Sequence, residues 1–242
     1  MSTAQASTWA DGPMAVFDIE STGVDVTSDR IVTASVVSIQ GATPRVRSWL
    51  ANPGIEIPAS ATEVHGITTE HAVAHGDDAG RVVIEVANAI IDAWALGMPV
   101  VIYNAPFDLS MLDCELRRHG YDGLTVGGLV VDPFVLDKAL DRYRKGSRKL
   151  IDTARHYRVP LSTEDAHTST GDCLAAARVA WKLSRAYPAI GRMSASELMA
   201  FQAEAAREQA VSLQQHFRRQ GKHELVDPSW PIRPFVTAGA SA

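Results

Sequence analysis

Short apolar and β-branched stretches dominate the first fifty residues and predict three strands. Residues 14–17 are an apolar run, residues 30–39 are rich in β-branched side chains, and residues 44–50 form a shorter stretch after a glycine. Such side chains fit a pleated, half-buried surface. Because short connections separate the three stretches, we expect them to pair as the antiparallel start of a sheet.

Beyond residue 80 the pattern changes to helices alternating with short buried strands. Apolar residues recur at helical spacing over 82–96, and further helices are predicted from 105 to 119, 133 to 140, 150 to 157 and 172 to 187. Residues 99–103 and 129–131 are predicted to be buried strands. Residues 52–54 are predicted to be a turn, and the following stretch up to residue 68 lacks sustained periodicity and is predicted to be loop with at most one helical turn. The order predicts a mixed five-stranded α/β sheet with helices on its faces.

The last fifty residues differ in pattern from the rest. Ser194 and Glu197 match a capping box, residues 198–219 have the composition of a long helix, and the prolines in 226–231 exclude regular helix or central strand there. We predict a tail at 1–12, a main domain at 13–188, and a C-terminal helix with a Pro- and Trp-containing tail at 189–242. This last segment is expected to pack on the main domain or to dock to another protein.

Composition restricts the class of protein. Of 242 residues, 46% are hydrophobic and 21% charged, which supports a sizeable core, and the net charge of -5 argues against bulk attraction to polyanions. A polyanionic partner must therefore be held by a local patch or by metal ions. Cys114 and Cys173 are interpreted as reduced thiols. Because no leader pattern and no run of about 18 apolar residues is visible, we expect a cytoplasmic protein without a membrane span.

Four acidic residues stand at predicted strand ends or helix starts. Asp18 and Glu20 are two positions apart on an extended chain, so their carboxylates point to one face and repel unless a cation lies between them. Asp108 follows a buried strand, and His167 precedes Asp172 in a polar loop. Oxygen ligands of this kind suit Mg²⁺ or Mn²⁺, and a pair of such ions supports phosphoryl chemistry. Considered singly, Asp108 and Asp172 could also be ordinary acids of a first helical turn.

Three segments in this order resemble the motifs of the DnaQ-like 3′-5′ exonucleases, in the His-containing (DEDDh) branch that includes the epsilon subunit of DNA polymerase III. The matching segments are D-I-E-S-T-G at 18–23, N-A-P-F-D at 104–108, and His167 with Asp172 five positions later. Shorter matches occur at 64–68 and 147–152. The resemblance covers about residues 14–185 and implies a ribonuclease-H-like fold.

The resemblance also implies a mechanism. Asp18, Glu20, Asp108 and Asp172 would hold two divalent ions, Mg²⁺ or Mn²⁺, with Asp18 bridging them. His167 would be the general base, since an imidazole with a pKa near 6.5 is mostly neutral at working pH. The expected reaction is hydrolysis of the terminal phosphodiester of a single-stranded DNA end, which releases nucleoside 5′-monophosphates. Ser21 stands where the family has threonine, so its side-chain contact is the least secure element of the motif.

Substrate contacts are expected from residues in or beside these motifs, namely Ser21, Thr22, Gly23, His65, Asn104, Phe107, Arg148 and Lys149. Structural alternatives stay open for several of them. Asn104 could cap the following helix, His65 could be a turn residue, and Phe107 could belong to the core. The basic strip at 142–149 could be a solvated face or a track for phosphates.

The function is likewise open between alternatives. A DNA exonuclease in proofreading or repair competes with an exoribonuclease of the same family that trims RNA or short oligonucleotides. An inactive module that binds nucleic acid or docks to a partner is the alternative from another class, and the complete set of four acids and one histidine argues against it. The expected partners are single-stranded 3′ ends, DNA before RNA, and a polymerase or other protein at the C-terminal region.

Overall fold

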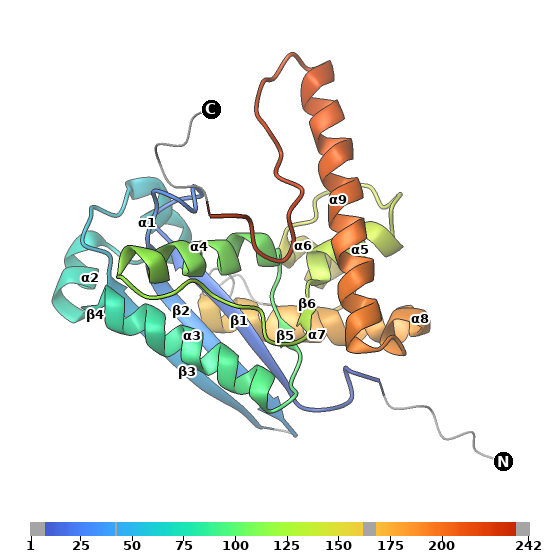
Figure 1. The fold of residues 1–242 in the computed structure, drawn as a ribbon, viewed down its shortest axis with the longest axis horizontal. Coiled ribbons are helices and arrows are strands. Elements are labelled where there is room, and N and C mark those ends of the chain that lie inside the picture. Colours follow the sequence, from blue (N-terminus) through green and yellow to red (C-terminus); the bar gives the residue numbers. More distant parts are fainter. Residues whose placement is uncertain (1–7, 42, 162–167, 236–242) are drawn as a thin grey trace.

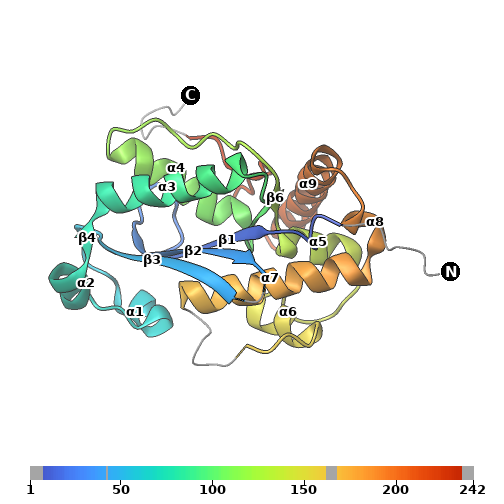
Figure 2. The same cartoon turned by 90° about the horizontal axis from the view of Figure 1, so that it is seen from below.

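The computed structural model describes residues 8–41, 43–161 and 168–235. A mixed sheet of six strands, in the order β4-β3-β2-β1-β5-β6, lies between two layers of helices (Figures 1 and 2). In chain order the elements are β1 (Met14–Ser21), β2 (Ile31–Gln40), β3 (Thr43–Asn52), α1 (Ala59–His65), α2 (Thr69–His75), β4 (Asp77–Asp78), α3 (Ala79–Ala95), β5 (Val100–Val101), α4 (Ala105–Arg118), β6 (Val130–Val131), α5 (Pro133–Leu140), α6 (Leu150–His156), α7 (Ser169–Ala186), α8 (Pro188–Gly191) and α9 (Ala195–Arg219).

The sheet confirms the predicted mixed α/β architecture. β1, β2 and β3 are antiparallel neighbours, while β5 and β6 run parallel to β1. The sixth strand is β4, which pairs with Ala51 and Asn52 of β3. The sequence predicted five strands because β4 consists of two exposed aspartates and has no apolar pattern.

The alternation of side chains along β1 separates two layers of the core. Ala15, Phe17 and Ile19 pack with α3 and α4, whereas Met14 and Val16 pack with α5 and α7. Figure 2 shows these helices on opposite sides of the sheet. Because side chains alternate along a strand, positions 18 and 20 continue the row that faces α7.

Two boundaries differ from the prediction. The stretch up to residue 68, predicted to be loop with at most one helical turn, contains α1, and α2 follows where no element was predicted. Each helix is seven residues long, and α1 buries no side chain, so no apolar stripe marks it. α7 begins at Ser169 and not at Asp172, because Thr168 caps the helix by accepting a hydrogen bond from the Gly171 N–H at 3.1 Å. Gly171 therefore lies inside the helix.

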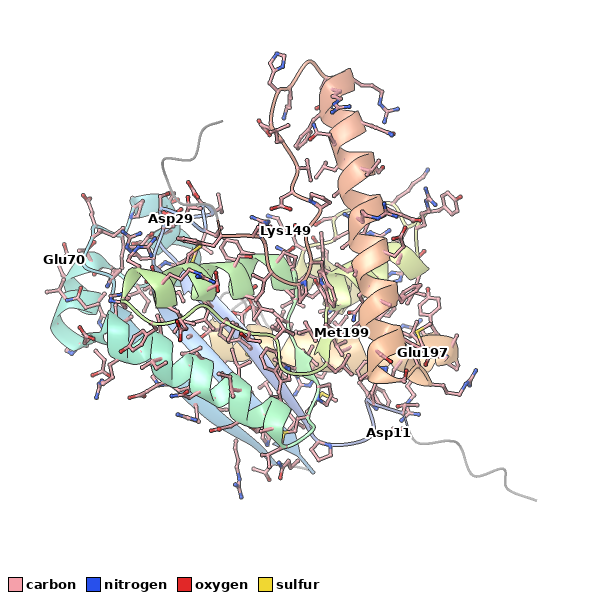
Figure 3. The ribbon with its side chains drawn as sticks, in the orientation of Figure 1. Asp11, Asp29, Glu70, Lys149, Glu197 and Met199 are labelled. Atoms are coloured by element: carbon pink, nitrogen blue, oxygen red, sulfur yellow. The ribbon has the colours of Figure 1, made fainter. Side chains whose placement is uncertain are left out.

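The C-terminal helix α9 joins the sheet through buried contacts in its first turns. The Gln202 side chain is fully buried; its Nε2 donates to the Val130 carbonyl at 2.9 Å and its Oε1 accepts from the Asp132 N–H at 2.7 Å. Met199 lies beside β6, where its sulfur accepts from the Val130 N–H at 3.3 Å (Figure 3). The predicted boundary at residue 188 stays a prediction, although the first half of α9 shares a core cluster with α7.

The end of α9 projects beyond the sheet layers, and the following segment folds back along it and crosses α4 (Figure 1). Gln214 joins the two parts of this arm: its Nε2 donates to the Glu224 carbonyl at 3.0 Å and its Oε1 accepts from the Val226 N–H at 2.9 Å. None of the helices formed by the described residues has both the length and the apolar character that crossing a bilayer requires.

Candidate active site

Three carboxylates meet where the end of β1 faces the first turn of α7. Oxygen atoms of Asp18, Glu20 and Asp172 all lie within 4.8 Å of one another. The alternation of β1 directs the first two toward α7, and the Thr168 cap places Asp172 in the first turn opposite them. The two-residue spacing seen in the sequence thus produces a compact acidic cluster with the predicted third member.

Asp108 reaches the same end of β1 from α4. It is 4% exposed, and its Oδ1 accepts a hydrogen bond from the Ile19 N–H at 3.2 Å, between the two β1 acids in sequence. Asp108 is not one of the three residues whose oxygens converge within 4.8 Å. Its carboxylate still repels those of Asp18 and Glu20. The structure therefore gathers all four predicted acids in one region.

The site is strongly unfavourable for negative charge. Burial raises the pKa of Asp18 and of Asp108 well above the ordinary range, and repulsion from neighbouring carboxylates adds to the shift. Burial, followed by repulsion from Asp172, raises the pKa of Glu20 to about 8. Asp18 Oδ2 is buried and has no hydrogen-bond donor among the described residues. An oxygen-preferring divalent cation would satisfy this atom and offset the repulsion, so the donor set fits such an ion.

This electrostatic arrangement predicts a pH-dependent response to divalent ions. A carboxyl with a raised folded-state pKa destabilises the fold increasingly as pH rises from about 4.5, its unfolded value, through about 8 for Glu20. The melting temperature of the metal-free protein should therefore be lower at pH 8 than at pH 6, and Mn²⁺ should raise it more at pH 8. Thermal unfolding with and without Mn²⁺ measures this. Glu20→Gln should reduce the pH dependence; an equal response to Mn²⁺ at both pH values would contradict the prediction.

A chain of hydroxyl groups fastens the start of α7 to the sheet. Ser35 Oγ, fully buried on β2 opposite Asp18, lies 2.7 Å from Ser169 Oγ and 3.0 Å from Thr170 Oγ1. Ser48 Oγ of β3 lies 2.9 Å from Ser35 Oγ. These contacts hold the turn that carries Asp172. The sequence analysis missed the two contacts between β2 and α7 because they join residues 134 and 135 positions apart.

The loop after β1 uses its motif residues partly for its own support. Ser21 Oγ donates to the Gly23 carbonyl at 2.7 Å, and the buried Thr22 donates from Oγ1 to Asp29 Oδ1 at 2.9 Å. A Cβ on Gly23 would lie 2.5 Å from Asp29 Oδ2, so a larger residue there would displace the carboxylate that holds Thr22. The side chain of Thr22 therefore has a structural role, which leaves the backbone and Ser21 as the candidates for substrate contact.

His65 ends α1 beside the end of β1. Its Nδ1 accepts from the Ile67 N–H at 3.1 Å, which is the turn role foreseen as one alternative. Burial lowers the pKa of His65, and the backbone of Ser21, close by, opposes that shift. The half-buried ring thus sits against the strand end that carries the acids.

Asn104 precedes α4 in the left-handed conformation, with φ of 68°. Its side chain makes no capping hydrogen bond, so the capping alternative is wrong. The Asp132 carboxylate accepts from the N–H groups of Asn104 and Ala105 instead, at 2.9 and 3.0 Å. Phe107 is half-buried and packs on the core between α3 and α4.

The basic strip divides into structural and exposed side chains. Arg148 is 14% exposed; it donates to Asp137 Oδ2 at 2.7 Å and to the carbonyls of Asp137, Asp141 and Arg144. Arg144 pairs with the same fully buried carboxylate. Arg142, Lys145 and Lys149 are exposed. These contacts favour a structural role for Arg148 and leave the other three cations available to a polyanion.

Arg148→Ala and Lys149→Ala should therefore behave differently. The first leaves buried Asp137 with fewer partners and should cost roughly 3 kcal/mol of unfolding free energy, the low end for breaking a buried ion pair. The second should leave stability unchanged and lower the slope of log affinity against log salt by about 0.7, the value for one phosphate contact on a single strand. Chemical denaturation and oligonucleotide binding at several salt concentrations separate the two. A reduced salt slope in a stable Arg148→Ala protein would assign phosphate binding to Arg148.

His167, the predicted general base, lies outside the described residues, so its role stays a prediction.

Asp132 and Asp137 are buried residues that support the site and that the sequence analysis did not select. For Asp132 a signal was present: an aspartate before Pro133 at a strand end is a typical helix start. For Asp137, which stands among other charged residues in the sequence, nothing nearby in the sequence indicated that its side chain is buried.

Comparison with known proteins assigns the class. Residues 15–180 match the RNase_T family model, described as Exonuclease. The match spans more than half of the chain, which therefore belongs to this family of DnaQ-like exonucleases.

Particular relatives agree with this assignment. A DNA polymerase III subunit epsilon-like protein of Rhodobacter capsulatus is 33% identical over 181 residues, which are 73% of this chain and 24% of the relative. A PolC-type DNA polymerase III of Caldanaerobacter subterraneus is 28% identical over 197 residues, 81% of this chain and 13% of the relative. The chain thus spans less than a quarter of these relatives. E. coli exonuclease I, solved with a dT13 oligonucleotide, shares the fold, with a TM-score of 0.60 and 16% identity over 74% of this chain and 43% of that chain.

Proposed function

We propose that this protein is a metal-dependent 3′-5′ exonuclease that removes nucleoside 5′-monophosphates from single-stranded DNA ends. The observation that carries the proposal is the half-buried cluster of Asp18, Glu20 and Asp172, in which one buried Asp18 oxygen has no donor among the described residues. Family membership and the names of the relatives, which are DNA polymerase III components and a nuclease bound to oligodeoxynucleotide, support DNA as the substrate class.

In this proposal Asp18, Glu20, Asp172 and Asp108 hold two divalent ions, Mg²⁺ or Mn²⁺. Such ions supply charge neutralisation for a phosphodiester and ready a water for attack. Asp18 is the best candidate to bridge them, because it is repelled by all three other acids. His167 would accept the proton of the attacking water. The Asn104 side chain, which does not cap α4, would contact the terminal nucleotide.

Exposed cations would guide the strand toward this site. Arg142, Lys145 and Lys149 lie on the loop that ends at α6, and the Tyr103 hydroxyl donates to the Arg148 carbonyl of that loop. Tyr103 directly precedes Asn104, so the loop is tied to the start of α4. Non-specific single-strand binding uses basic grooves of this kind.

The test is a shortening assay with 5′-labelled single-stranded DNA and RNA of the same sequence. With Mg²⁺ or Mn²⁺, we expect DNA to lose one nucleotide at a time from its 3′ end, and chelation by EDTA to stop the reaction. Preferential shortening of RNA would support the exoribonuclease alternative. Folded protein that shortens neither substrate at any ion concentration would eliminate the nuclease proposal and leave a binding or docking module.

Three further expectations remain predictions. They are proofreading or repair as the cellular role, a polymerase as a partner of the C-terminal region, and a cytoplasmic location.

A further inference from the structure

Asp132 is a fully buried carboxylate between β6 and α5 that joins four parts of the chain. Its oxygens accept five hydrogen bonds from described residues: Asn104 N, Ala105 N, Phe134 N, Val135 N and Trp230 Nε1. Its own N–H donates to Gln202 of α9 at 2.7 Å. A buried carboxylate with this many donors is held in one orientation, and so are the groups that donate to it.

The Asp132 carboxylate determines where α4 begins. Two of its five donors are the N–H groups of the last residue before α4 and of the first residue in it, at 2.9 and 3.0 Å. Asn104 there adopts the left-handed conformation, which asparagine tolerates better than most residues, and its own side chain makes no capping hydrogen bond. Asp108 follows within the first turn and reaches the Ile19 N–H. The position of Asp108 relative to Asp18 thus depends on Asp132.

The C-terminal tail completes the surroundings of Asp132. The Trp230 indole N–H donates to Asp132 Oδ2 at 3.2 Å, and the ring packs on the core between the sheet and α4. Three residues further, the Arg233 N–H donates to the buried Ser110 Oγ of α4 at 2.8 Å. Figure 1 shows this segment crossing α4. All of these tail residues lie outside the segment that matches the family, 15–180.

We propose that Asp132 and Trp230 are positioning residues for the metal site: the tail, through the indole N–H and the Asp132 carboxylate, sets the start of α4 and thereby the place of Asp108. The C-terminal segment is then a working part of the exonuclease unit. This inference rests on the proposed function in one respect, that Asp108 is a metal ligand.

The experiment compares the full chain with Trp230→Phe, which keeps a smaller aromatic ring and removes the donor, and with Asp132→Asn. Mn²⁺ binding without nucleic acid is measured by electron paramagnetic resonance, and amide exchange is followed over residues 102–108. Loss of an outer hydrogen-bond partner weakens metal sites by about 10- to 100-fold. We expect a loss in this range for Asp132→Asn and roughly threefold to tenfold for the more remote Trp230→Phe. Both variants should exchange faster at the start of α4.

Phe235→Ala is the matched control, because it removes an aromatic side chain of the same tail that lies over Arg117 at the other end of α4. It should keep the Mn²⁺ affinity and the exchange rates of the parent. Trp230→Phe with parental affinity and parental exchange over 102–108 would overturn the proposal, as would a parent that binds no Mn²⁺. If Asp132→Asn fails to fold, Trp230→Phe decides alone. If the parent binds Mn²⁺ but degrades no nucleic acid, weaker Mn²⁺ binding in the two variants would support the positioning role and reject the proposed function.

Discussion

Replacing Asp18 by asparagine is expected to abolish nuclease activity and at the same time to stabilise the metal-free protein. The residue contributes to a site where ions would supply several kcal/mol of transition-state stabilisation, so the rate with Mg²⁺ or Mn²⁺ should fall by at least ~10³-fold. The carboxylate is buried, its pKa is raised well above the usual range, and three acids repel it. An uncharged amide removes that repulsion, so the melting temperature without metal should rise.

Asp25→Asn is the matched control for this experiment. Asp25 is an exposed acid in the loop after the same motif; its Oδ1 accepts hydrogen bonds from the Thr27 N–H and hydroxyl, which hold its pKa below the usual range. Its replacement should leave the shortening rate unchanged and should not stabilise the protein. An active Asp18→Asn enzyme would contradict the assignment of Asp18 to the metal site, and inactivity with a lowered melting temperature would contradict the electrostatic account.

The second large effect is expected from His167→Ala. Removal of a general base typically slows the chemical step by about 10²- to 10⁴-fold. Because the four acids remain, Mn²⁺ affinity should be unchanged while the rate at saturating Mn²⁺ falls. The parent rate should rise with pH around 6.5 as the imidazole loses its proton, and the variant should lose that rise. Pre-steady-state cleavage across pH 5.5 to 8 measures both effects.

His216→Ala, which changes an exposed histidine in the last turns of α9, provides the comparison and should retain the parental rate and pH profile. A His167→Ala protein with near-parental activity would remove the histidine from the mechanism and leave the acidic cluster in place. Simultaneous loss of Mn²⁺ affinity would instead show that the residue supports the metal site.

The acidic cluster was predictable because its geometry is mostly local. Two positions of separation on a strand bring Asp18 and Glu20 to one face, and a helix start after a polar loop brings Asp172 to its first turn. The placement of Asp108 near this cluster could be predicted from the order of the strand and the helix that follows it. The mixed sheet followed for the same reason, since short connections and buried runs are sequence-local signals.

The supports of the site were not predictable in this way. The contacts of Ser35 with Ser169 and of Asp132 with Trp230 join residues that are 134 and 98 positions apart. From the sequence, the cations at 142–149 could not be told apart. In the structure Arg148 pairs with the buried carboxylate of Asp137, whereas Lys149 is exposed. α1 and β4 escaped notice because neither buries an apolar side chain.

The alternation of β1 has a consequence for how this chain can change during evolution. The eight residues of β1 pack against helices on both faces of the sheet and also supply the first pair of acids. Substitutions at Ala15, Phe17 or Ile19 alter the α3 and α4 side without changing the carboxylates directly. Insertion or deletion of a single residue would exchange the two faces, bury acids among apolar groups and turn Phe17 toward α7. We therefore expect related chains that keep the activity to keep the length of this strand, even where its apolar residues are replaced by other apolar residues.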